Sequence, residues 1–169
     1  SVKAVVQHAN PEEVYTEIRA QLERARAMGF EPTHFDSHMG TLFGSPQFME
    51  RYIRLGIENK IPVMVPGGHN TSIGRQEGLT PEQQTGLLQV GQMLWSSGLP
   101  VLDDLHNVSY DWKYPEGKKP SDKSLQKFVT SKYIETIGEL KPGLTMVTMH
   151  CTFPSEIFEK ISGSGQKRK

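Results

Sequence analysis

The segment from His34 to His38 places three polar side chains at alternate positions. His34, Asp36 and His38 are separated by Phe35 and Ser37. Successive side chains of an extended chain point to opposite faces, so the three polar groups would share one face. Imidazole and carboxylate groups bind Zn²⁺ and other divalent ions, and an Asp commonly orients a metal-bound His. The spacing fits part of a metal site, and it equally fits side chains that hydrogen-bond a loop at the end of a strand.

His150 is a second candidate for chemistry, because it follows the apolar run 144–149. The unperturbed pKa of a histidine side chain lies near neutral pH, as a general acid or base requires. Cys151 would point to the opposite face of an extended chain, which argues against a Cys–His nucleophilic pair. His150 is therefore either a proton-transfer residue or a structural histidine.

Further polar residues follow other apolar runs. Asp103, Asp104 and His106 come after residues 99–102, where they could line a pocket or cap a helix, since Asp is a favoured N-cap. His69 follows two glycines and is either a pocket residue or an ordinary loop residue. Trp112 lies in a polar loop, where it could stack on a sugar ring or pin the loop. The candidate substrate-pocket residues are His34, His69, Asp103, His106 and Trp112.

Four helix–strand units can position these side chains. Helices are predicted after the N-caps Asn10, Ser45 and Thr80, each followed by Pro, and a fourth over 124–140. The strand-like segment 32–38 and the apolar runs at 61–65, 99–102 and 144–149 are predicted as strands, and Trp95 is expected in the core. This alternation favours an α/β fold with parallel strands, whose carboxyl ends carry the ligands and catalytic groups. All histidines except His8 lie at or near that edge.

Composition narrows the classes of function. The chain has 169 residues, of which 36% are hydrophobic and 22% charged, with a formal net charge of zero. We expect one domain over 1–162 and a flexible tail over 163–169. The balanced charge argues against nucleic-acid binding, and the lack of a long apolar run predicts a cytoplasmic protein without a membrane span. The single Cys151 excludes an internal disulfide.

The run Pro32 to Phe43, PTHFDSHMGTLF, resembles the Thr-His-(apolar)-Asp-Ser-His signature of the YdjC-like carbohydrate deacetylases. The helix starting at Pro11 resembles the one that leads into that signature. His150 resembles the family's C-terminal histidine, although the family usually has Cys before His and here Cys151 follows it. The resemblance implies a partial or distorted (β/α) barrel that removes N-acetyl groups from amino sugars or oligosaccharides by divalent-metal-assisted hydrolysis.

The resemblance also implies roles for individual residues. His38 would be a metal ligand, Asp36 would orient it or the attacking water, and His150 would protonate the leaving amine. The metal, Mg²⁺ or Zn²⁺, would polarise the acetyl carbonyl and activate water. The family's Asp-Asp strand and a further ligating His precede the signature, and no such motif precedes it here. We therefore expect the chain to be incomplete at its N-terminus or unable to hold the metal.

Two other functions stay open on the sequence alone. One is a metal-dependent barrel hydrolase of another amide or ester class. The other is a non-catalytic sugar-binding fragment, which would lack the missing metal ligands. The apolar helix faces are also compatible with a homodimer.

Overall fold

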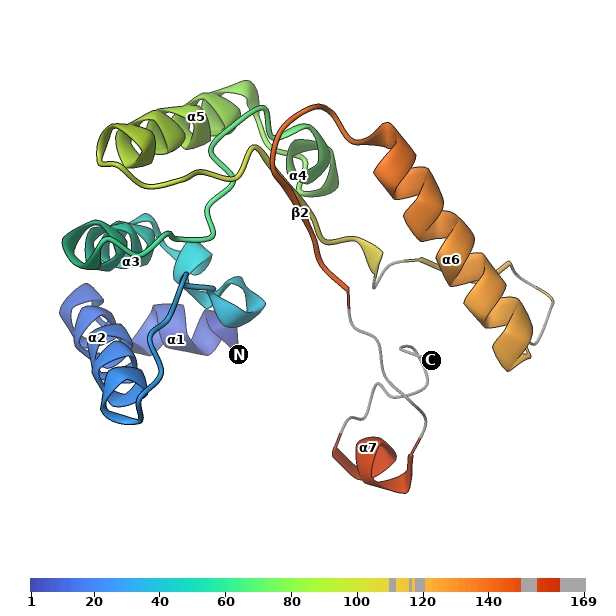
Figure 1. Cartoon of the computed structure of the whole chain (residues 1–169), viewed down its shortest axis with the longest axis horizontal. Helices are drawn as coiled ribbons and strands as arrows, with labels where there is room; N and C mark the ends of the chain where they lie inside the picture. The colour runs from blue at the N-terminus through green and yellow to red at the C-terminus, as the bar shows by residue number, and fades with distance from the viewer. Residues whose placement is uncertain (110–111, 116, 118–120, 150–154, 162–169) are drawn as a thin grey trace.

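A computed structural model of the chain describes residues 1–109, 112–115, 117, 121–149 and 155–161, in which helices predominate. The helices are α1 (Val2–His8), α2 (Pro11–Ala27), the 3-10 segment η1 (His38–Gly44), α3 (Pro46–Asn59), α4 (Thr71–Gln76), α5 (Pro81–Ser96), α6 (Asp122–Glu139) and α7 (Glu156–Ile161). The described residues form two regular strands, β1 (Asp104–His106) and β2 (Thr145–Val147). Helices α2, α3, α5, α4 and α6 follow one another along an arc (Figure 1).

Strands β1 and β2 pair in parallel, with Asp104 opposite Thr145 and His106 opposite Val147. Two isolated parallel bridges lie earlier in the chain, Phe35 with Val63 and Pro66 with Leu102. The extended segments therefore adjoin one another in chain order, and each has the same direction as its neighbour. This confirms the prediction of an α/β fold with parallel pairing.

The predicted strands at 32–38, 61–65 and 99–102 are each reduced to one bridge residue, Phe35, Val63 and Leu102 respectively. Proline explains part of this reduction, because Pro32, Pro62, Pro66 and Pro100 have no N–H to donate to a ladder. Across the described residues the strands form no closed barrel.

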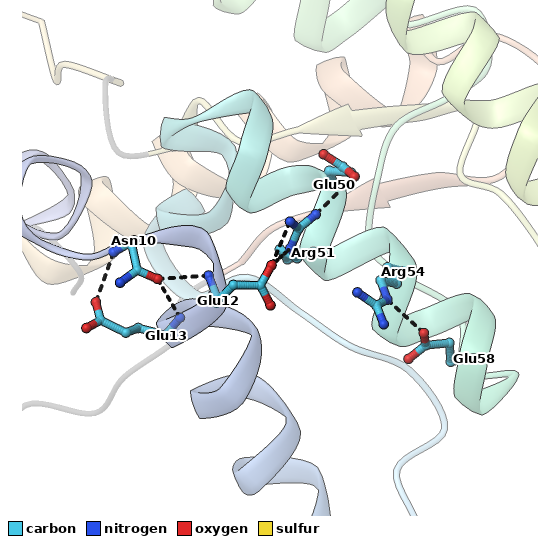
Figure 2. Close-up of polar contacts among 7 residues, drawn as sticks. All are labelled: Asn10, Glu12, Glu13, Glu50, Arg51, Arg54 and Glu58. Atoms are coloured by element: carbon cyan, nitrogen blue, oxygen red, sulfur yellow. Dashed lines mark hydrogen bonds and ion pairs between the residues drawn. The ribbon is translucent and has the colours of Figure 1, made fainter.

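Helix α2 begins with a complete capping box (Figure 2). The Asn10 side chain accepts hydrogen bonds from the N–H groups of Glu12 and Glu13, and the Glu13 carboxylate accepts one from the Asn10 N–H. Arg51 of α3 donates to the Glu12 carboxylate at 2.8 Å and also pairs with Glu50. These contacts fix the start of α2 and hold it against α3.

The main hydrophobic core lies between α3, the segment 61–65 and the end of α5. Its buried side chains are Tyr52, Ile53, Val63, Val65, Leu94 and Leu99. In the segment 61–65 the odd-numbered residues are buried and Pro62 and Met64 are partly exposed, which is the period of two expected of a strand.

The side of α5 that faces the core was predicted wrongly at one residue. Trp95 was expected in the core, but its side chain is 71% exposed. Leu94 is fully buried, and adjacent residues of a helix point about 100° apart, so Trp95 faces away from the core. The apolar residues of α6 are also less buried than expected, since Ile134 and Ile137 are both exposed.

None of the helices in the described residues is both long enough and apolar enough to cross a bilayer. The expected tail over 163–169 lies outside the described residues, as does His150.

Candidate functional site

A groove of about 710 Å³ lies beside the segment that carries the predicted metal ligand. Residues of α1, α2, η1, α3 and the segment 32–38 line it. His34, Asp36 and His38 all belong to this lining, together with the acidic residues Glu13 and Glu17 of α2. The structure therefore brings the three alternate polar residues of the sequence to one groove.

The backbone of this segment is fixed from its inner side. The Phe35 N–H donates to the Pro62 carbonyl at 2.8 Å, and the Met64 N–H donates to the Phe35 carbonyl at 3.0 Å. The Tyr52 hydroxyl donates to the same Phe35 carbonyl at 2.6 Å and accepts the Met64 N–H at 3.0 Å. Burial raises the pKa of Tyr52, so its hydroxyl keeps its proton and donates. Asp36 therefore directly follows a residue whose carbonyl accepts hydrogen bonds from both Met64 and Tyr52.

The side chains on either side of Phe35 alternate as predicted. Ser37 is buried, and its hydroxyl accepts the Leu42 N–H at 2.9 Å. His34, Asp36 and His38 are exposed. Exposure therefore alternates as predicted, with Phe35 partly buried and Ser37 buried, although all five residues from 34 to 38 line the groove.

The chain turns sharply directly after His38. Met39 and Gly40 both have left-handed backbone conformations, with φ of 55° and 67°. The Gly40 N–H donates to the Ser37 carbonyl at 2.8 Å, and the Thr41 hydroxyl donates to the His38 carbonyl at 3.1 Å. A left-handed Met is unusual and costs conformational energy, so the surrounding hydrogen bonds must enforce this turn. The turn sets the position of His38 at the end of the strand-like segment.

The residues of the groove include donors that a divalent ion would accept. Asp36 offers carboxylate oxygens and His38 an imidazole nitrogen, and neither is buried. Within the described part of the chain, no three His, Cys, Asp or Glu side chains converge closely enough to hold a metal ion. The described residues supply donors of the right type and not a complete ligand set.

A second cluster of polar residues lies around the buried carboxylate of Asp104, which is 1% exposed. Asp104 accepts the N–H groups of Ser72 at 2.8 Å, Ile73 at 3.1 Å and Leu105 at 2.9 Å. Ser72 and Ile73 open α4, so Asp104 caps that helix from a distant strand. Burial alone would raise the pKa of this carboxyl, but the three N–H donors hold the pKa below its usual value. Asp104 therefore caps a helix from β1, and the N-cap residue of α4 itself is Asn70.

Two histidines lie near this carboxylate in the structure. The Nδ1 atom of His69 lies 3.5 Å from Asp104 Oδ2. His106, two residues along β1, is 6% exposed, and its Nε2 lies 3.3 Å from the Thr136 hydroxyl. Burial lowers the pKa of His106, so the imidazole is neutral at pH 7. The Trp112 ring lies beside it, with the ring centroids 6.0 Å apart.

Asp103, another predicted pocket residue, has a structural contact instead. Its Oδ2 accepts the Leu144 N–H at 2.8 Å, while its own N–H donates to the Leu144 carbonyl. These two bonds join the start of β1 to the start of β2.

The predicted site residues thus fall into two groups. His34, Asp36 and His38 share the groove, whereas His69 lies beside Asp104 and Trp112 lies beside His106 of the same strand. No described contact joins the two groups, and the predicted proton donor His150 lies outside the described residues.

The sequence analysis missed Asn70, which is 2% exposed with a left-handed backbone. Asn is the non-glycine residue that most readily adopts this conformation, so its position after Gly67-Gly68-His69 was an available signal.

Comparison with known proteins places the chain in a family. It is 26% identical over 155 residues to the "Carbohydrate deacetylase" of Thermus thermophilus, a match that covers 92% of this chain and 49% of that protein. The chain therefore spans about half the length of that curated relative. The family described as YdjC-like protein matches residues 1–169, the whole length of the chain. On this match the chain belongs to the YdjC-like family.

Proposed function

We propose that this chain is part of a carbohydrate deacetylase, an enzyme that removes N-acetyl groups from amino sugars or oligosaccharides. The chain contributes the groove that holds Asp36 and His38. The observation that carries the proposal is the joint placement of Asp36 and His38 on one exposed groove. The family match over the whole chain and the name of the Thermus thermophilus relative, carbohydrate deacetylase, support the same reaction class. The parallel order of the extended segments supports a partial (β/α) barrel as the fold of the complete enzyme.

The chain's own residues take distinct parts in the proposed reaction. His38 would hold a divalent ion, either Mg²⁺ or Zn²⁺, and Asp36 would orient that imidazole or the attacking water. When bound, such an ion supplies Lewis-acid polarisation of the acetyl carbonyl. His150 would give a proton to the departing amine, the step at which the C–N bond breaks. His34, at the same groove, would contact the substrate.

The experiment measures acetate released from N-acetylchitooligosaccharides, in the presence of a chelator and after addition of Mg²⁺ or Zn²⁺. We expect release to stop with the chelator and return with one of the ions. His38→Ala should lower the affinity for that ion, as read by calorimetric titration, since it removes a direct ligand. His8→Ala is the matched control, because His8 is an exposed histidine of α1 outside the groove lining.

Other outcomes distinguish the alternatives. Release of a different acid from an amide or ester panel would indicate another hydrolase class. Saccharide binding without turnover or metal dependence would indicate a non-catalytic binding module. Ion affinity that stays unchanged in His38→Ala would reject His38 as the ligand.

His150 has a separate test. His150→Ala should reduce turnover by a factor of about 10² to 10⁴, because general acid catalysis contributes on that order. An early melting temperature with normal turnover per folded molecule would reject the catalytic role.

A further inference from the structure

Tyr52 of α3 contacts the segment that carries Asp36 and His38. Its side chain is 2% exposed, belongs to the main hydrophobic core and also lines the groove. Its hydroxyl donates to the Phe35 carbonyl at 2.6 Å. A core residue on a helix is thus bonded directly to the residue before Asp36.

The side chains of Asp36 and His38 have no anchor of their own. Both residues are exposed. Within the described part of the chain, neither side chain makes a hydrogen bond or an ion pair. Their directions therefore depend on the backbone that carries them and on the choice of rotamer. The contacts that fix this backbone decide where the two side chains can reach.

The Tyr52 hydroxyl acts on the peptide plane that joins Phe35 to Asp36. The Phe35 carbonyl accepts both this hydroxyl and the Met64 N–H, the latter at 3.0 Å. A peptide unit is planar, so the direction of the Phe35 carbonyl also sets the direction of the Asp36 N–H and the position of its Cα. The plane before Asp36 is thus held by donors from two elements, the segment 61–65 and α3.

The Tyr52 ring contacts the chain beyond His38. It packs edge to face against Phe43 of η1, with the ring centroids 6.2 Å apart and the ring planes at 81°. Aromatic pairs favour this arrangement. Leu42, the neighbour of Phe43, packs against the same hydrophobic core. Tyr52 therefore contacts residues on both sides of the segment 36–42.

The other hydrogen bonds of this segment lie within it. The Ser37 carbonyl accepts the Gly40 N–H at 2.8 Å, and the Ser37 hydroxyl accepts the Leu42 N–H at 2.9 Å. These two bonds shape the turn but do not attach it to another element. The turn includes Met39 with a φ of 55°, which is costly for a residue other than glycine. Contacts at the ends of the segment therefore help to keep the turn in place.

We propose that Tyr52 is a positioning residue of the candidate site. Its hydroxyl orients the peptide plane before Asp36, and its ring holds η1 after His38. Asp36 and His38 thereby keep the separation and directions that binding one divalent ion requires. The inference rests on the proposed function, which assigns these two residues to the ion, and Tyr52 acts on them only through the backbone.

The first test measures amide hydrogen exchange by NMR in the full chain without added ion. Tyr52→Phe keeps the ring and removes only the hydroxyl. We expect the N–H groups of Gly40 and Leu42 to exchange about 3- to 10-fold faster, although Tyr52 bonds neither of them, because the segment is released at one end. Tyr15→Phe is the matched control, since Tyr15 of α2 lies outside the groove lining, and both rates should stay unchanged in it.

The Leu94 N–H separates positioning from general stability. Leu94 is fully buried in α5, so its exchange reports opening of the whole fold. Rates at Gly40 and Leu42 that stay unchanged in Tyr52→Phe, or that rise only by the factor seen at Leu94, overturn the proposal. Should Tyr52→Phe fail to fold, Phe43→Leu removes the ring contact at the other end of the segment, and it carries the same expectation.

The second test is calorimetric titration of the same variants with Zn²⁺ and with Mg²⁺. We expect Tyr52→Phe to bind the ion about 10-fold more weakly, as is common when a residue that supports metal ligands is altered. Tyr15→Phe should bind it as the unaltered chain does. Equal affinity in Tyr52→Phe and the unaltered chain overturns the positioning role, even where exchange is faster.

The two tests also keep this inference apart from the proposed function. Faster exchange at Gly40 and Leu42 in a chain that binds neither ion supports Tyr52 as the residue that holds the segment, and it rejects the proposed function. Ion binding and acetate release that are both unaffected by Tyr52→Phe support the proposed function and reject the positioning role.

Discussion

Replacing Asp104 should destabilise the fold more than any other single carboxylate described in the structure. The carboxylate is almost fully buried and accepts three backbone N–H groups, two of them at the start of α4. A hydrogen bond to a charged group contributes roughly 1.5–3 kcal/mol, and loss of an N-cap costs roughly 0.5–2 kcal/mol. These terms overlap, so we expect Asp104→Ala to lower the free energy of unfolding by about 3–5 kcal/mol. Asp104→Asn keeps one acceptor oxygen and should cost less.

The same contacts predict a pH dependence. The pKa of Asp104 is lower in the folded chain than in the unfolded chain, because the N–H donors outweigh the effect of burial. The folded state therefore binds the proton less readily, and its extra stability is fully present above the unfolded pKa of about 4. That contribution is lost as the pH falls below about 4 through the folded pKa. Asp104→Asn should lose this component of the pH dependence.

Urea unfolding followed by circular dichroism, at several pH values from about 7 to about 3, measures both effects. Asp122→Asn is the control, because Asp122 is an exposed carboxylate in the first turn of α6, and it should change stability by less than about 1 kcal/mol. A loss below about 1 kcal/mol for Asp104→Ala would refute the assigned capping role. So would an unaltered slope of stability with pH below about 4 in Asp104→Asn.

Two further substitutions test the packing around the groove and the sheet. Tyr52→Phe removes the two hydrogen bonds of the Tyr52 hydroxyl, to the Phe35 carbonyl and from the Met64 N–H, and should cost about 1–3 kcal/mol in urea unfolding, whereas Tyr15→Phe should cost under about 1 kcal/mol. Gly91→Ala should cost about 1–3 kcal/mol or more, because its Cβ would lie 2.1 Å from the Gly67 carbonyl oxygen. Gly86→Ala in the same helix meets no atom within 4 Å and should stabilise the chain by roughly 0.5–1 kcal/mol. Equal effects at the two glycines would contradict the close approach of α5 to the segment at Gly67.

The sequence predicted the helices well because their signals are local. Pro11, Pro46 and Pro81 each open a helix where the N-cap pattern placed one. The spacing of Val14 and Leu22 predicted the buried face of α2. The extent of the strands was harder to predict. An apolar run shows where a strand can form, but the prolines within it limit how many residues pair with a neighbouring strand. The short helix α4 was not predicted, since its cap comes from Asp104, far away in the sequence.

In the candidate site, too, the features set by local sequence were predictable and those set by distant residues were not. The alternation of His34, Asp36 and His38 was predictable, because it depends only on an extended backbone. The structural use of Asp103 and Asp104 was left open by the sequence, since the partners of both are distant along the chain. Trp95 was placed in the core wrongly, because hydrophobicity alone does not say which side of α5 faces inward.

The two polar groups are joined by a single extended segment. Residues 63–66 form a bridge with Phe35 on one side and with Leu102 on the other. Phe35 precedes Asp36 in the groove, and Leu102 precedes the aspartates that fix β1. A shift of this segment along its length would therefore move Asp36 relative to the cluster around Asp104. The burial of Val63 and Val65, and the Tyr52 hydroxyl that binds the Met64 N–H, oppose such a shift. The spacing between the two groups thus depends on core packing under the segment, and not on either polar group itself.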